Sequence, residues 1–227
     1  MSGVEKFIAL ILNLKKGRPS FSQDGEDIVL YDMFEEMHIT KGFYVDIGAH
    51  HPFRYSNTYL FYQKGWSGIN VEPTPGRVKL FQRFRSRDIN LQIGVGLSNP
   101  AMNFYCFDEP ALNTFDNQTK SEREREGFPV TDTISIPVIS LSELLHTYLP
   151  PDTTIDFMTV DAEGMDLDIL KSNDWKKYRP TLIVVEDTQY KFEQPENSEI
   201  YRFMKAHHYS LVAKLHRSAI YRGSHAT

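Results

Sequence analysis

The chain has 227 residues, of which 41% are hydrophobic and 24% charged, with a formal net charge of −5 and a pI near 5.9. This composition excludes disordered and fibrous proteins and suits one buried α/β core. The acidic balance disfavours nucleic acid as a partner, because following a phosphate backbone requires clustered Lys and Arg. The single cysteine, Cys106, excludes a disulfide framework within the chain and a cysteine-ligated zinc site.

The apolar run at residues 7–12 is too short to span a bilayer, and it lacks the flanks of a signal peptide. We expect a helical extension over residues 1–20, docked on the domain or on a partner chain, with a peripheral membrane anchor as the alternative. The sequence therefore predicts a cytoplasmic protein without a transmembrane segment, and it is compatible with a homo-oligomer.

Up to residue 95, helical and strand-like segments alternate. Apolar residues either repeat at helical spacing or form short continuous runs bounded by glycine and polar residues. In chain order we expect a helix over 24–37, a strand over 43–47, a helix over 58–63, a strand over 68–71, a helix over 75–84 and a strand over 89–95.

The pattern changes between residues 98 and 140. Two strand-like runs, 102–107 and 133–138, flank a polar region in which residues 119–127 are charged almost throughout. We interpret the charged run as a solvated helix face or loop, with a mobile lid as the alternative. Residues 98–140 would then be a hairpin or lid region inserted into a single domain spanning 1–227.

Regular alternation resumes after residue 140. The expected elements are a helix over 141–148, a strand over 155–160, a helix over 166–170, a strand over 182–185, a helix over 198–207 and a closing hairpin of 209–215 with 218–221. The pattern predicts an α/β fold: a mostly parallel twisted sheet with helices on both faces and a C-terminal antiparallel hairpin. Ligands of such sheets bind at the carboxyl ends of the strands.

The first strand leads into a glycine turn, Asp46-Ile47-Gly48-Ala49. The dinucleotide fingerprint Gly-x-Gly-x-x-Gly is missing, which favours a ligand with an ammonium and a carboxylate over one with a pyrophosphate. After the second strand, Glu72 stands where an acidic residue binds two ribose hydroxyls. The alternative is an ordinary exposed carboxylate at a strand end.

Acidic residues also follow two later strands. Asp161, Glu186 and Asp187 would share one edge of the sheet. They would either accept a proton from a substrate hydroxyl or hold a divalent cation such as Mg²⁺. His51, in the pair just past the first strand, is a further candidate general base beside Asp161 and Glu186, although a histidine pair in a loop is often a surface feature.

Several motifs, taken in order, resemble FkbM-type methyltransferases. They are SQDGED at 22–27, GFYVDIGAHHP at 42–52, SNT at 56–58, GWSGINVEP at 65–73, VDAEG at 160–164 and VVE at 184–186. The resemblance covers roughly residues 20–215. One departure is Ala162, at a position where the family commonly has Val, and residues 100–140 contain no motif that identifies a substrate.

The resemblance implies a class I methyltransferase (Rossmann-like) fold and S-adenosylmethionine as cofactor. It implies O-methylation of a hydroxyl on a sugar, glycan or polyketide-type small molecule. The cofactor contacts it implies are Gln23, Glu26, Asp46, Gly48, Ala49, Asn57, Glu72, Gly94, Val95 and Asp161. Among these, Glu72 would hold the ribose, and Gly94 with Val95 would flank the adenine.

Other classes of function fit the predicted sheet less well. A nicotinamide-dependent oxidoreductase would need the missing glycines, and a non-catalytic module would bind the cofactor without transferring a methyl group. A nucleic-acid methyltransferase would need a basic face.

Overall fold

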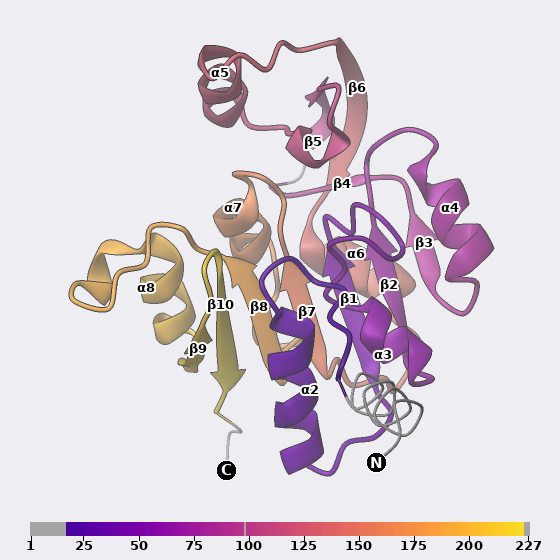
Figure 1. The fold of residues 1–227 in the computed structure, drawn as a ribbon, viewed down its shortest axis with the longest axis vertical. Coiled ribbons are helices and arrows are strands. Elements are labelled where there is room, and N and C mark those ends of the chain that lie inside the picture. The colour runs from indigo at the N-terminus through magenta and orange to yellow at the C-terminus, as the bar shows by residue number, and fades with distance from the viewer. Residues whose placement is uncertain (1–16, 98, 225–227) are drawn as a thin grey trace, which may run out of the picture.

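A computed structural model describes residues 17–97 and 99–224, whose fold is drawn in Figure 1. Most of the helical extension expected over residues 1–20 lies outside these residues, and residues 17–20 form no helix. The strands of a seven-stranded main sheet are, in sheet order, β3 (Ile89–Leu91), β2 (Ser67–Val71), β1 (Phe43–Ile47), β7 (Phe157–Val160), β8 (Leu182–Glu186), β10 (Ser218–Gly223) and β9 (Tyr209–Lys214). A smaller, three-stranded sheet consists of β4 (Gly94–Val95), β6 (Asp132–Ile139) and β5 (Asn99–Cys106).

The main sheet is parallel from β3 to β8. Ile47 at the end of β1 is paired with Val71 of β2 and with Val160 of β7, so the carboxyl ends of these strands are level. Only β10 runs against its neighbours, pairing antiparallel with β8 and with β9. The expected α/β fold with a mostly parallel sheet and a closing hairpin is confirmed.

Helices cover both faces of the main sheet (Figure 1). They are α2 (Glu26–Glu36), α3 (Tyr59–Gln63), α4 (Arg77–Phe84), α6 (Leu141–Tyr148), α7 (Asp166–Lys171) and α8 (Glu199–Ala206), with short 3₁₀ turns η1 (Pro110–Leu112) and η2 (Pro195–Asn197). Strand residues alternate between the two faces, because successive side chains of a strand point to opposite sides. No helix formed by residues 17–97 and 99–224 has the length and hydrophobicity that crossing a bilayer requires.

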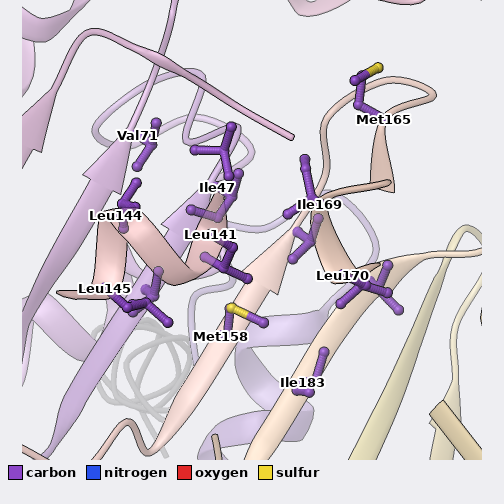
Figure 2. Packing of buried hydrophobic residues seen from close by; sticks show 14 of the residues in the cluster. Ile47, Val71, Leu141, Leu144, Leu145, Met158, Met165, Ile169, Leu170 and Ile183 are labelled. Carbon is purple, nitrogen blue, oxygen red and sulfur yellow. The ribbon is translucent and has the colours of Figure 1, made fainter. Parts of the chain in front are cut away.

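Two separate hydrophobic clusters hold these layers together. On one face, Leu30 and Phe34 of α2 pack with Phe61 of α3 against Tyr44 and Phe157 of the sheet. On the other face, α6, α7 and α8 pack against Ile47, Met158 and Ile183. Figure 2 shows this second cluster, in which Leu141 and Leu144 of α6 lie beside Ile47 and Val71. Both faces of the central strands are therefore buried, which leaves the strand ends as the places where a site can form.

The strand expected over residues 89–95 is wrong in one respect, since it is divided between the two sheets. Residues 89–91 pair with β2, whereas Gly94 and Val95 pair with β6. A side chain at Gly94 would lie 2.7 Å from Val138 Cγ2 and 2.8 Å from Phe115 Cζ. The backbone of β4 therefore packs tightly against Val138 and Phe115. The chain leaves the main sheet after Leu91 to reach this position.

The smaller sheet and the helix α5 (Asn117–Arg125) project beyond the carboxyl ends of the main strands (Figure 1). β5 and β6 form an antiparallel pair, and α5 lies in the connection between them. The charged run at 119–127 forms most of α5 and the turn after it, and its side chains are largely exposed, as expected for a solvated helix. Arg123 is the exception, because it is buried.

Candidate active site

A cavity of about 280 Å³ lies at the carboxyl edge of the main sheet, under the smaller sheet. One part of its wall is apolar and includes Val71, Ile93, Phe104, Phe115 and Ile169. Another part is acidic and includes Glu72, Asp161, Glu163 and Glu186, with Arg217 as the basic side chain among the described lining residues. The cavity thus combines an apolar pocket with an anionic one.

Gly48 forms the closest contact between two strand ends. Its backbone is left-handed, with φ +84°, and a Cβ atom there would lie 1.8 Å from the carbonyl oxygen of Asp161. Only glycine adopts this conformation freely and leaves that space empty. Gly48 and Asp161 both line the cavity, so the absent side chain brings the β1 turn and the end of β7 together at its floor.

Glu72 is fixed at the end of β2 by two backbone hydrogen bonds. The N–H of His50 donates to Oε2 and the N–H of Thr74 donates to Oε1, both at 2.8 Å. Burial raises the pKa of this carboxyl, while the hydrogen bonds from Thr74 and His50 oppose the rise. Each carboxylate oxygen keeps a further acceptor site, because a carboxylate can accept about four hydrogen bonds. A pair of vicinal hydroxyls matches this arrangement.

The two adjacent histidines, His50 and His51, lie in different environments. His50 lines the cavity, and its Nε2 is buried without a hydrogen-bond partner in the described structure. Burial, reinforced by the charges of Arg77 and Arg54, lowers the pKa of His50 to about 4, so the ring is neutral at pH 7. His51 is not among the lining residues, and its Nδ1 accepts hydrogen bonds from the N–H groups of Phe53 and Arg54. The expected base, His51, therefore does not line the cavity.

Asp161 lines the cavity, and its carboxylate has no hydrogen-bond or ion-pair partner in the described residues; its Oδ1 is fully buried. Burial raises the pKa of Asp161 well above its ordinary value, and the nearby charges of Glu186 and Glu163 raise it further. Buried polar atoms normally have partners, because an unsatisfied one costs free energy. The free carboxylate is therefore a position for a cationic or hydrogen-donating group of a ligand.

Glu163 and Glu186 line this cavity and also a second, more polar one of about 540 Å³. Glu163 has a left-handed backbone, with φ +51°, and forms an ion pair with Arg123 of α5. Burial raises its pKa to about 7 although the charge of Arg123 lowers it. Glu186 has no hydrogen-bond or ion-pair partner within 17–97 and 99–224, and burial raises its pKa while Arg217 opposes the rise. The two carboxylates therefore mark the boundary between the cavities.

The expected metal ligands Asp161, Glu186 and Asp187 are not gathered into one donor set. Asp187 is held by other partners, since its Oδ2 accepts a hydrogen bond from the hydroxyl of Ser198 at 2.6 Å and its Oδ1 one from the N–H of Tyr190 at 3.1 Å. Within residues 17–97 and 99–224, no three His, Cys, Asp or Glu side chains are arranged to hold a metal ion.

The expected cofactor contacts are only partly assembled. Gln23, Gly48, Glu72, Gly94, Val95 and Asp161 line the cavity, whereas Glu26, Asp46, Ala49 and Asn57 do not. Asp46 is outside the cavity because of the face of the sheet that it occupies. It points to the α3 face of the sheet, where its Oδ2 accepts a hydrogen bond from the Thr58 hydroxyl, and burial raises its pKa to about 6.

The other three residues outside the cavity are bonded to neighbouring parts of the fold. The Asn57 side chain donates to the hydroxyl of Thr159, and Glu26 accepts hydrogen bonds from the Asp24 N–H and the Ser218 hydroxyl. Ala49 is buried and uses its N–H to bond the carbonyl of Val71.

Sequence reasoning missed residues that reach the cavity from the inserted region. Asn113 joins the insert to the loop after β2, because its amide donates to the Thr74 hydroxyl at 3.0 Å. Thr114 donates its hydroxyl to the carbonyl of Glu163 at 2.7 Å. Asn113 and Thr114 belong to no motif that the sequence offers, so only the three-dimensional structure identifies these contacts.

The cavity suits S-adenosylmethionine in three respects. Its acidic wall balances the positive sulfonium and ammonium groups, its apolar wall fits a purine, and Glu72 presents two acceptors to a ribose. A dinucleotide fits less well, because four carboxylates would repel its pyrophosphate.

The family model for the methyltransferase FkbM domain matches residues 46–211. The chain belongs to this family. It is therefore an S-adenosylmethionine-dependent methyltransferase, and the class I fold implied by the motifs agrees with the observed sheet. No curated protein matches the chain.

Solved structures of methyltransferases resemble this FkbM-domain chain distantly. A TehB-like SAM-dependent methyltransferase from Corynebacterium glutamicum has 11% identity and a TM-score of 0.44, with 97% of each chain covered. The precorrin-6y C5,15-methyltransferase from Geobacter metallireducens has 9% identity and a TM-score of 0.40, covering 86% of this chain and 88% of its own. The 1,6-didemethyltoxoflavin-N1-methyltransferase from Burkholderia thailandensis, solved with S-adenosylhomocysteine, has 11% identity and a TM-score of 0.42, covering 99% and 92%.

Proposed function

We propose that this methyltransferase methylates a hydroxyl group, with Glu186 as the general base. The observation that carries the proposal is the position of Glu186, whose unpartnered carboxylate lies on the walls of both cavities. A base must contact the acceptor at the place where the acceptor meets the methyl donor. Of the three expected bases, His51 is outside the cavity and Asp161 lines the first cavity alone.

Asp161 and Glu72 hold the two ends of the cofactor in this proposal. S-adenosylmethionine, when bound, supplies a methyl group activated by the positive charge on sulfur. Glu72 accepts hydrogen bonds from the ribose hydroxyls through the acceptor sites that His50 and Thr74 leave open. Asp161 neutralises a positive charge of the cofactor, which also gives its buried carboxylate the partner that it lacks.

The proposed step is a direct transfer that balances in atoms and charge. The acceptor oxygen forms a bond to the methyl carbon as the carbon–sulfur bond breaks, and sulfur retains the electron pair of that bond as a neutral thioether. The hydroxyl proton passes to the carboxylate of Glu186, and from there to solvent. Holding the reacting atoms in line supplies up to about 7–11 kcal/mol of the barrier reduction. Proton acceptance by Glu186 contributes roughly 10²–10⁴-fold.

The acceptor classes suggested by the family resemblance are a sugar, a glycan or a polyketide-type small molecule. The lid role of residues 98–140 within one domain, the divalent cation, the cytoplasmic location and the homo-oligomer also stay predictions. Dialysis against EDTA followed by a methyl-transfer assay tests the cation, since a magnesium-dependent enzyme would lose activity and regain it on adding Mg²⁺.

The function is tested by calorimetry with S-adenosylhomocysteine together with a methyl-transfer assay using radiolabelled S-adenosylmethionine. We expect Asp161→Asn to weaken cofactor binding, whereas Glu186→Gln should bind the cofactor normally and lose transfer. NAD provides the control ligand, and stronger binding of NAD than of S-adenosylhomocysteine would favour an oxidoreductase. Normal cofactor binding without transfer to any hydroxyl compound would favour a non-catalytic module.

A further inference from the structure

Arg217 brings a positive charge to the cofactor cavity from the C-terminal hairpin. It lies in the turn between β9 and β10, one residue before Ser218, which pairs with Glu186 at the carboxyl end of β8. Because β10 runs antiparallel to β8, its first residues lie at the edge of the sheet where the parallel strands end (Figure 1). Arg217 and Glu186 both line the cavity. The hairpin therefore adds a basic side chain to the edge at which the parallel strands present acids.

The backbone of Arg217 is held by two distant parts of the chain. Its carbonyl accepts a hydrogen bond from the N–H of Asp187 at 2.9 Å, and its N–H donates to Oδ2 of Asp24 at 3.1 Å. The hydroxyl of the next residue, Ser218, donates to Oε1 of Glu26 at 2.7 Å. Asp24 and Glu26 belong to the N-terminal motif SQDGED. The end of β8 and this motif together fix the place from which the Arg217 side chain starts.

The guanidinium of Arg217 has few partners of its own. Its Nη2 lies 3.4 Å from Oδ1 of Asp24, which is longer than the roughly 2.7–2.9 Å of a strong charge-assisted hydrogen bond. Its Nε is buried and has no hydrogen-bond acceptor in the described residues. A guanidinium has five N–H donors, and a buried donor without an acceptor costs free energy. Arg217 therefore has donors left for an anionic group that enters the cavity.

Other basic side chains near the cavity already have partners. Arg123 forms an ion pair with Glu163, and the ammonium of Lys214 donates to backbone carbonyls of its own turn. Arg77 donates to a backbone carbonyl in the loop after β1. Arg123, Lys214 and Arg77 are absent from the described residues that line the cavity. Among the described residues, Arg217 is thus the cation best placed to meet a ligand there.

The cofactor contains one group that requires such a cation. S-adenosylmethionine has a sulfonium and an ammonium, which suit the acidic wall, but it also has a carboxylate, which that wall repels. Along the edge of the sheet, Glu72 follows β2, Asp161 follows β7 and Arg217 precedes β10. Asp161 therefore lies between the other two in strand order. With the ribose at Glu72, the methionine end of the cofactor extends toward Arg217.

We propose that Arg217 binds the carboxylate of the cofactor and makes the site selective for the complete methionine moiety. This inference rests on the proposed function, in which Glu72 holds the ribose and Asp161 a positive charge. An arginine and a carboxylate form paired, charge-assisted hydrogen bonds, for which the planar fork of arginine is better suited than the ammonium of lysine. The carboxylate also supplies an acceptor to the guanidinium. A cofactor analogue without this group leaves the guanidinium unsatisfied.

Calorimetry on the complete chain with two matched ligands tests the proposal. They are S-adenosylhomocysteine and 5′-deoxy-5′-(3-aminopropylthio)adenosine, which differs from it only by the missing carboxylate. We expect the wild type to bind the second ligand at least about tenfold more weakly, since it loses hydrogen bonds between charged groups. Arg217→Met should bind S-adenosylhomocysteine about tenfold or more weakly and should no longer discriminate between the ligands. Arg217→Lys should keep the charge but discriminate less than the wild type.

Arg222→Met is the matched control, because Arg222 is an exposed arginine of the same strand and pairs with Leu182 at the other end of β8. It should discriminate like the wild type. Equal affinity of the wild type for both ligands would overturn the proposal, and so would an unchanged affinity ratio in Arg217→Met or Arg217→Lys.

A purely structural role of Arg217, through its contact with Asp24, would lower both affinities by the same factor and leave their ratio unchanged. Failure of the wild type to bind S-adenosylhomocysteine would instead contradict the proposed function. The two failures are therefore distinguishable in the same titrations.

Discussion

The α-carbon of Gly48 packs so closely on the carbonyl of Asp161 that a methyl group added to it would lie 1.8 Å from the oxygen. This contact connects the turn after β1 with the end of β7 and sets the floor of the cofactor cavity. The substitution Gly48→Ala should therefore separate the two strand ends. We expect a loss of more than about 2 kcal/mol of unfolding free energy, combining backbone strain with the clash, together with loss of cofactor binding.

The control variant Gly127→Ala distinguishes the effect of backbone strain from that of the clash with Asp161. Gly127 has φ +94°, close to the value at Gly48, but no atom lies within 4 Å of the position where its Cβ would be. It should lose only about 1 kcal/mol, the cost of the left-handed backbone. Urea denaturation and calorimetry with S-adenosylhomocysteine measure both effects, and equal losses in the two variants would contradict the role of the Asp161 contact.

Asp46→Asn should stabilise the protein at alkaline pH and leave cofactor binding unchanged. Burial raises the pKa of Asp46 from 3.8 to about 6, so the folded protein binds more protons than the unfolded one between these values. The contribution of Asp46 to stability therefore falls as the pH rises through this window, by up to about 3 kcal/mol. The variant should gain this amount in urea denaturation at pH 8 and nothing near pH 3.5. Lost affinity for S-adenosylhomocysteine would instead place Asp46 in the cofactor site.

Glu72→Gln should weaken cofactor binding by roughly 10–100-fold, the cost of hydrogen bonds to a charged acceptor. The amide that replaces one oxygen would also face the N–H of His50 or Thr74, with which it cannot bond. Calorimetry with S-adenosylhomocysteine and with its 3′-deoxy analogue checks the ribose assignment. The wild type should discriminate between the two ligands and the variant should not. Glu36→Gln, on the exposed side of α2, is the control.

The turnover rate should increase with pH, and the midpoint of the increase should lie above the pKa of an ordinary glutamate. Burial raises the pKa of Glu186, and a general base acts only when ionised, so protonation at lower pH stops transfer. The pH profile of kcat in a methyl-transfer assay should show this step. In Glu186→Gln the step should disappear and kcat should fall by roughly 10²–10⁴-fold. An unchanged profile in the variant would assign the proton to another group.

Protonation of Asp161 should affect a different kinetic constant from protonation of Glu186. Its pKa is also raised, but in the proposed function it binds the cofactor, so its protonation should raise the KM for S-adenosylmethionine and leave kcat unaffected. Asp161→Asn should remove the pH dependence of KM. A pH-dependent kcat that disappears in this variant would make Asp161, and not Glu186, the base.

The order of elements could be predicted from the sequence because the central strands are buried on both faces and read as short apolar runs. That same property hides which face a polar residue occupies. Asp46 precedes the glycine turn by two positions, but alternation along β1 places it with Tyr44 on the α3 face, away from the cavity. The run ending at Val95 gave no sign of a break, since leaving the main sheet after Leu91 depends on packing around Gly94.

The site itself could be predicted only where a strand end determines it, as at Gly48, Glu72, Asp161 and Glu186. Which of two adjacent histidines reaches the cavity depends on the left-handed backbone of His50, with φ +53°, and residue type does not reveal that conformation. Arg123 lies within a charged run whose other members are solvated, and its partner Glu163 comes from a distant part of the chain. Long-range ion pairs of this kind leave no local pattern.

The position of β10 between β8 and β9 makes the order of synthesis differ from the order in the sheet. When β9 emerges from the ribosome it cannot yet join the main sheet, because β10, its neighbour in that sheet, has not been made. Until then β8 has an open edge, which is a site where another chain can add a strand. The nascent protein therefore exposes an aggregation-prone edge from the completion of β8 until β10 has been added.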